Sequence, residues 1–227
     1  MSNLKPFEFD SVKTCLRPFL GMSTKSLSDV PVESLTEEME FLLDRCDTSG
    51  YQIREDTRQG IMKTIACFAT RRVYEIMKRA DPFTSVQPPK GVMLCGGVGT
   101  GKTTLLKILR RCSGAVYLSV TDIVGSLLTD GWGFAECSCT KYQRYGMIID
   151  DLGQESDLQH YGTKLSRFLE LMIERRYQRF EKDGIMTVIA TNLQPKDIEV
   201  AYGERTVSRL AAMVDIVPFN GTDWRKR

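Results

Sequence analysis

The chain has 227 residues, of which 42% are hydrophobic and 26% are charged, and its formal net charge is +2. This is the composition of an ordinary globular protein, and a charge so close to neutral favours no particular class of partner. No apolar run approaches the roughly 20 residues that a membrane-spanning helix needs.

The amino terminus and the cysteines indicate the compartment. MSNLKPFEFDSVK carries acids early and lacks a long apolar core, so we expect no secretory signal there. The seven cysteines are an odd number and lie in core-like stretches, which favours reduced thiols over a disulfide framework. Cys137 and Cys139 form only a C-x-C pair beside a single histidine, so we expect no zinc site. We predict a cytoplasmic protein.

Residues 1–50 are predicted to form a small helical region. Ser34–Cys46 has apolar residues that can share one helical face, and Ser34 and Glu37 have the spacing of a capping box. A second, longer helix is expected over about Asp56–Arg79, after a break around Gly50. Its second half is basic, which is typical of a solvated helix end and leaves a nucleic-acid patch as the alternative.

From Gly91 onward, short apolar strands alternate with helices. This alternation predicts a parallel sheet that is covered on both faces, with its ligand at the carboxyl ends of the strands. The expected strands are Val92–Cys95, Ala115–Val120, Gly146–Asp151, Gly184–Asn192 and Asp215–Phe219. The expected helices are Thr103–Cys112, Asp122–Leu128, about Thr163–Phe180 and about Arg205–Met213.

A phosphate-binding loop follows the first of these strands. Residues 96–103 read GGVGTGKT and fit the pattern G-x-x-x-x-G-K-[ST]. Glycines let consecutive backbone N–H groups converge on phosphate oxygens, and the following helix offers its positive end. Lys102 is expected to reach the β- and γ-phosphates, and the Thr103 hydroxyl to bind Mg²⁺. The expected nucleotide contacts are Gly97, Val98, Gly99, Thr100, Gly101, Lys102, Thr103 and Thr104.

Polar side chains end two later strands. MIID is followed by a second acid, so Asp150 is predicted to serve the Mg²⁺ ion and Asp151 to orient or deprotonate the attacking water. The alternative for this pair is a solvated turn. Asn192 ends the next strand and is expected to contact the γ-phosphate or the water, although Asn before a Pro-containing loop is also ordinary turn chemistry. Glu155 is expected to be a surface acid.

Several segments together resemble the AAA+ ATPases, in the clade of the DnaC and DnaI helicase loaders and the IstB transposition helpers. GVMLCGGVGTGKT, IIDDLGQE and IATNL are similar to the P-loop, Walker B and sensor I segments of that clade. YGERTVSRL and the closing FNGTDWRKR resemble two further segments of it. The resemblance covers roughly Ile53–Arg227, which implies an ATPase domain over 51–227 and a separate, partner-binding region over 1–50.

The resemblance implies roles for three arginines. Arg209 is expected to be an arginine finger that reaches the nucleotide of a neighbouring subunit, and Arg205 an accessory position. Arg225 is expected on the side of the nucleotide site where the phosphates bind. A finger supplied in trans implies that copies of the chain assemble into a ring or spiral. The alternative for Arg205 and Arg209 is a pair of solvated or ion-paired arginines on one helix face.

The resemblance further implies the fold of a P-loop NTPase, a three-layer sandwich around a five-stranded parallel sheet. Only eight residues follow Phe219, so a C-terminal helical lid is not expected.

Asp151 stands where many AAA+ proteins have Glu, which implies slow turnover. Loaders grip single-stranded DNA, and Asp122–Gly146 has aromatic and basic residues suited to that contact, although buried aromatics are more common.

The function expected from these features is an ATP- and Mg²⁺-dependent loader that binds a hexameric replicative helicase and single-stranded DNA. Two alternatives remain open: an IstB-like ATPase helper of DNA transposition, and a nucleotide-binding scaffold with negligible hydrolysis.

Overall fold

The computed structural model describes residues 32–81, 86–130, 146–155, 159–160 and 163–226. At its centre lies a five-stranded sheet in the order β2-β3-β6-β1-β7, in which every paired strand runs parallel to its neighbour. The carboxyl ends of the five strands therefore lie on one edge of the sheet. The strands are β1 (Gly91–Cys95), β2 (Val116–Ser119), β3 (Met147–Leu152), β6 (Thr187–Thr191) and β7 (Val214–Pro218).

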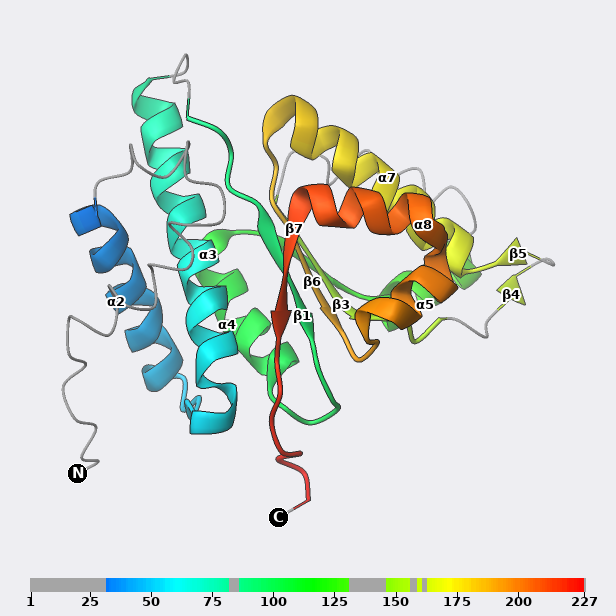
Figure 1. Ribbon diagram of the computed structural model, residues 1–227, viewed down its shortest axis with the longest axis horizontal. Helices are drawn as coiled ribbons and strands as arrows, with labels where there is room; N and C mark the ends of the chain where they lie inside the picture. Colours follow the sequence, from blue (N-terminus) through cyan, green and yellow to red (C-terminus); the bar gives the residue numbers. More distant parts are fainter. Residues whose placement is uncertain (1–31, 82–85, 131–145, 156–158, 161–162, 227) are drawn as a thin grey trace.

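Helices cover both faces of this sheet (Figure 1). One layer holds α2 (Val32–Thr48), α3 (Glu55–Ala80) and α4 (Lys102–Ser113), and the other holds α5 (Val120–Asp130), α7 (Ser166–Asp183) and α8 (Pro195–Met213). The predicted three-layer α/β sandwich of the P-loop NTPase type, with its five parallel strands, is confirmed.

The alternation of side chains along the strands explains why both faces need a helical layer. In β1, Val92 and Leu94 belong to the apolar cluster under α2, α3 and α4, whereas Met93 and Cys95 belong to the cluster under α5, α7 and α8. Successive residues of a strand point to opposite faces, so an entirely apolar strand must be buried on both. All five residues of β1 and of β6 are buried.

The described part of the amino-terminal region packs against the same layer. Leu35, Met39, Leu42 and Cys46 of α2 are buried in one apolar cluster with residues of α3, α4 and the sheet. The helix begins at Val32, so Ser34 lies inside it and not at its amino-terminal cap, and the predicted capping box is wrong. The division into a region over 1–50 and an ATPase domain over 51–227 stays a proposal.

Two later elements differ from the prediction. Helix α8 begins at Pro195, ten residues before the expected start, because proline fits the first helical turn and Gln194 and Asp197 form a capping box there. Gly203 interrupts the helix with φ 79°, and apolar side chains are buried both before it, at Ile198 and Tyr202, and after it, at Leu210 and Met213. Helix α7 begins at Ser166, because 163–164 instead form β5 (Thr163–Lys164), which pairs with β4 (Gln159–His160).

The described cysteines are free thiols. Burial raises the pKa of Cys46 and of Cys95 to about 11, and that of Cys67 to about 12. These thiols are therefore protonated at neutral pH, and they pack as small apolar side chains. None of the helices that the structure describes is both long enough and apolar enough to cross a bilayer.

Phe168 is among the largest fully buried side chains, in the cluster under α7, and it is about 1% exposed. Phe168→Ala is expected to lower the free energy of unfolding by about 3–5 kcal/mol, because it removes buried apolar area and leaves a cavity. Leu171→Ala, on the same helix at a side chain that is 43% exposed, is the control and is expected to change stability by less than about 0.5 kcal/mol. Urea unfolding followed by circular dichroism measures both.

Candidate nucleotide-binding site

The loop between β1 and α4 has the backbone conformation that phosphate binding requires. Gly99 has φ 74° and Gly101 has φ 95°, in the left-handed region where a side chain is strained. Gly101 caps α4, so the loop leads directly into the amino-terminal end of a helix of 12 residues. Backbone N–H groups at such a position attract anions. Val98 and Thr104 are exposed and Thr103 is half-buried, which leaves the loop accessible.

Lys102 connects this loop to the neighbouring strand. Its ammonium group donates to the backbone oxygens of Gly96 at 2.7 Å and Gly97 at 2.8 Å, and to the Asn192 Oδ1 at 2.9 Å. The side chain is 5% exposed, and burial lowers its pKa, while the charges of Asp151 and Asp150 offset part of that effect. The structure thus brings Lys102 and Asn192, two of the predicted site residues, into contact.

Asp150 lies at the carboxyl end of β3 and is completely buried, with 0% exposure. The Asp151 N–H donates to its Oδ1 at 3.1 Å, and the Tyr117 hydroxyl donates to its Oδ2. A buried carboxylate with this many donors is no solvated turn, so that alternative is wrong for Asp150. Sequence reasoning missed Tyr117, because its only signal was an aromatic residue inside an apolar strand.

Asp151 has an unusual backbone. Its φ of 61° makes it the one non-glycine with positive φ among the described residues, and the pairing of β3 with β6 is irregular between Ile149 and Leu152. Non-glycine residues in this conformation store strain and cluster at functional sites. The half-buried carboxyl has a raised pKa, caused first by burial and then by the charge of Asp150, while Lys102, Arg225 and Lys107 act against the rise.

The donor set of this site suits a magnesium-bound triphosphate. Mg²⁺ prefers hard oxygen ligands and takes few of them from protein. The half-buried Thr103 hydroxyl and the buried Asp150 carboxylate are such ligands, and Lys102 supplies the cation that phosphate oxygens need. Glycine at positions 99 and 101 keeps the backbone N–H groups uncovered. The residues present therefore fit the ion and the nucleotide that the sequence predicts.

The residues after β7 brace the loop from its other side. The Trp224 backbone N–H donates to the Gly99 backbone oxygen at 3.0 Å. A Cβ on Gly99 would lie 1.7 Å from the Asp223 carboxylate. The Trp224 ring stacks on Tyr51, with ring centroids 6.1 Å apart, and the Tyr51 hydroxyl donates to the Gly101 oxygen at 3.3 Å. The loop is thus held between the start of α3 and the closing segment of the chain.

Arg225 is exposed at the end of this segment, and its charge reaches Asp151. Arg205 and Arg209 lie on α8, and both side chains contact α7. The Arg209 Nε lies 2.5 Å from the Glu174 Oε2, and its guanidinium lies over the Tyr177 ring at 5.5 Å. Arg205 is 80% exposed and lies 3.7 Å from the same carboxylate. The structure does not bring these two arginines into the contacts around Lys102.

Glu155 was expected at the surface, and this expectation is wrong. Glu155 is 1% exposed, and its two oxygens accept from the Tyr202 hydroxyl and from the Gly153 N–H. The pair ties the loop after β3 to α8. Of the segment 122–146 that was expected to contact DNA, residues 131–145 lie outside the described residues, and with them all its aromatic residues.

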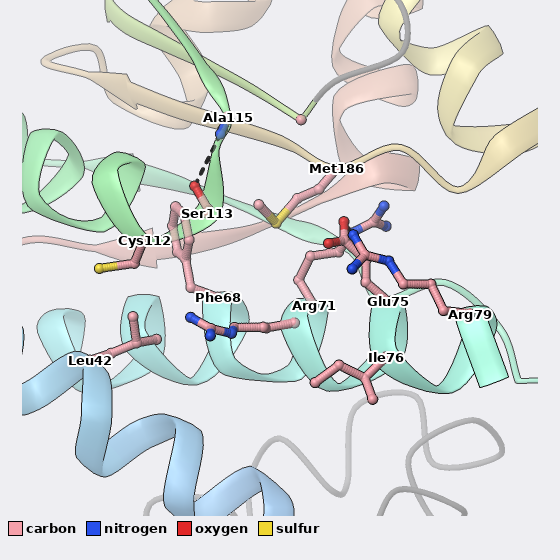
Figure 2. A pocket seen from close by; sticks show the side chains of 12 residues that line it. Leu42, Phe68, Arg71, Glu75, Ile76, Arg79, Cys112, Ser113, Ala115 and Met186 are labelled. Carbon is pink, nitrogen blue, oxygen red and sulfur yellow. Dashed lines mark hydrogen bonds and ion pairs between the residues drawn. The ribbon is translucent and has the colours of Figure 1, made fainter.

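A cavity of about 280 Å³ opens elsewhere, between α3, the end of α4 and the amino ends of the strands (Figure 2). Ala115, Gly146 and Met186, which precede β2, β3 and β6, line it, so it lies at the sheet edge opposite the phosphate loop. Basic residues from the second half of α3, namely Arg71, Arg72 and Arg79, line this cavity. Arg71 pairs with Glu75 at 2.8 Å and Arg72 with Glu38 at 3.0 Å, so these two arginines are engaged within the chain.

The chain is similar to several known proteins. It is 33% identical over 162 residues to fidgetin-like protein 1 of Rattus norvegicus, across 63% of this chain and 23% of that protein. It is 28% identical over 132 residues to the outer mitochondrial transmembrane helix translocase of Danio rerio, across 53% of this chain and 34% of that protein. The chain spans about a quarter of the length of the first of these relatives, so their activities do not transfer to it.

Among solved structures, the DnaC helicase loader matches with a TM-score of 0.44 and 20% identity, over 67% of this chain and 90% of that one. The structure of DnaI matches with a TM-score of 0.47 and 14% identity, over 75% and 88%. No protein-family model matches the chain. The fold and the loop between β1 and α4 together give the chain the architecture of a P-loop NTPase.

Proposed function

We propose that the chain is an ATPase that binds ATP with Mg²⁺ and hydrolyses it. The observation that carries this proposal is the contact of Lys102 with the loop carbonyls and with Asn192, beside the buried Asp150. Thr103 and Asp150 would hold the ion, which supplies positive charge to the phosphate oxygens when bound. Lys102 would contact the terminal phosphates, and Asp151 would accept a proton from the attacking water.

The experiment that tests this activity is release of inorganic phosphate from ATP by the purified full chain, with and without Mg²⁺. Turnover that requires Mg²⁺ and saturates with ATP supports the proposal. Tight binding of ATP without turnover would instead support a scaffold, and absence of binding would contradict the nucleotide site itself.

The biological role we propose is loading of a replicative hexameric helicase onto single-stranded DNA, with copies of the chain joined in a ring or spiral. The support is the resemblance of the motif segments to the DnaC and DnaI clade. A transposition helper shares these motifs and is the alternative. Binding to single-stranded DNA and to a helicase favours the loader, whereas binding to duplex DNA and to a transposase favours the helper.

A pull-down with a hexameric replicative helicase tests the partner, using the full chain and a chain without residues 1–31. The deletion ends before α2, because Leu35, Met39 and Leu42 of that helix are buried in the core and their loss would unfold the protein. Recovery of helicase by the full chain and loss of recovery on deletion would support the amino-terminal region as the partner-binding part. Failure of the full chain to recover helicase contradicts the loader.

Arg209→Ala tests whether the nucleotide lies between subunits. We expect nucleotide affinity to stay within about twofold and DNA-stimulated turnover to fall at least a thousandfold, because a guanidinium supplied in trans stabilises the charge of the transition state by about that factor. Arg175→Ala, an exposed arginine on α7, is the control. Thermal unfolding checks that loss of the Glu174 ion pair leaves the fold intact. Unchanged turnover would contradict the composite site.

A further inference from the structure

The buried carboxylate of Asp150 has a hydrogen-bond donor for each of its oxygens. The Asp151 backbone N–H donates to Oδ1 of Asp150, and the Tyr117 hydroxyl donates to Oδ2. Tyr117 lies on β2, which pairs with β3 so that Ser119 stands opposite Asp150. The tyrosine therefore reaches from the neighbouring strand, two residues upstream, toward the carboxyl edge of the sheet. Its hydroxyl is the one side-chain donor that the described residues give to Asp150.

The position of this hydroxyl is fixed by its surroundings. The Tyr117 ring is half-buried, and the Lys107 ammonium lies 5.4 Å from the ring centroid. A phenol hydroxyl donates its hydrogen to a carboxylate oxygen, and the Tyr117 hydroxyl makes this bond to Asp150.

An ionised carboxylate at 0% exposure is costly unless its lone pairs are satisfied. The Tyr117 phenol donates a hydrogen bond that satisfies a lone pair of the Asp150 carboxylate. A divalent cation that binds the Asp150 carboxylate, directly or through a bound water, competes with the Tyr117 phenol for the electron density of the carboxylate oxygens. A hydrogen bond to a charged acceptor is worth about 1.5–3 kcal/mol, so the competition is large enough to change the affinity for the ion.

We propose that Tyr117 is a positioning residue that satisfies Asp150 before the metal binds and thereby weakens the affinity of the site for Mg²⁺. The inference rests on the proposed function, because it takes Asp150 as the residue that serves the ion. It assigns a role to Tyr117 through its contact with Asp150. The site then binds Mg²⁺ strongly only together with a triphosphate, whose oxygens supply the remaining ligands.

Tyr117→Phe tests this inference, because it removes the hydroxyl and keeps the ring over which Lys107 lies. The measurement is binding of a fluorescent, non-hydrolysable ATP analogue at increasing Mg²⁺ concentrations. We expect the Mg²⁺ concentration at half-maximal binding to fall roughly tenfold in the variant. The melting temperature should fall without Mg²⁺, where Asp150 loses a donor, and should recover toward that of the parent with Mg²⁺ and the analogue.

Tyr202→Phe is the matched control. Like Tyr117, Tyr202 has a phenol that donates to a buried carboxylate, that of Glu155, but Glu155 is not a candidate metal ligand. Its removal should lower the melting temperature equally with and without Mg²⁺ and leave the half-maximal Mg²⁺ concentration unchanged. A purely structural role for Tyr117 predicts this same behaviour for Tyr117→Phe.

An unchanged or increased Mg²⁺ requirement in Tyr117→Phe overturns the inference and leaves the proposed function intact, provided that the parent binds the analogue in a Mg²⁺-dependent manner. A parent chain that binds no analogue at any Mg²⁺ concentration overturns the proposed function, and the inference with it.

Discussion

Lys102→Ala is expected to weaken ATP binding at least a hundredfold. The ammonium group lies at the centre of the site, with the Gly96 and Gly97 oxygens and the Asn192 amide all within 2.9 Å. One hydrogen bond between a cation and a charged acceptor contributes about 1.5–3 kcal/mol, and the terminal phosphates offer more than one. Calorimetry with a non-hydrolysable ATP analogue measures the change.

Arg110→Ala is the control for this result. It removes a cation from the exposed last turn of the same helix, at the end opposite the loop, and is expected to change affinity by less than about twofold. Circular dichroism checks that both variants are folded. A Lys102→Ala protein that binds and hydrolyses ATP like the parent would show that the 96–103 loop is not the nucleotide site.

Asp151→Asn is expected to lower turnover about a hundredfold or more while nucleotide affinity stays within about threefold. The substitution keeps the size of the side chain but removes its ability to accept a proton, and general-base catalysis contributes about 10²–10⁴ in rate. Single-turnover measurement of phosphate release separates this loss from an effect on binding. Asp122→Asn, at an exposed acid that bonds to Ser119, is the control and should keep full activity.

The same residue predicts the pH dependence of turnover. Burial and the charge of Asp150 raise the pKa of Asp151 above its ordinary value of 3.8. A base must be deprotonated to act, so turnover should increase with pH through this raised pKa, and the acid limb of the profile should lie above the range of an exposed aspartate. The limb should disappear in Asp151→Asn. A limb that persists would assign the titration to another group.

Local sequence signals predicted residues that the structure brings together at one edge of the sheet. The glycine spacing, the lysine and the acids at the end of an apolar strand each carry their chemistry within a few residues. The parallel sheet then brings the ends of β1, β3 and β6 to one edge, which explains how Lys102 and Asn192, 90 residues apart, come into contact.

The contacts that the sequence did not predict are those between distant elements. Tyr117 reads as one more apolar residue of a strand, and only the register of β2 against β3 places its hydroxyl at Asp150. Glu155 reads as a surface acid, because its phenol partner Tyr202 follows 47 residues later. Helix α8 was expected to start near Arg205, because its kink at Gly203 breaks the helical periodicity between the first half and the second.

The outer strands of the sheet bear on how copies of this chain can associate. Strand β2 has only four residues, and β7 ends in Pro218, which has no N–H to offer. The β7 edge also carries Asp215, 3.9 Å from the Lys90 ammonium. Short, charged and proline-ended edges resist the addition of a further strand. Copies of the chain that associate would then meet through helix and loop surfaces, and concentrated protein should remain free of cross-β fibrils.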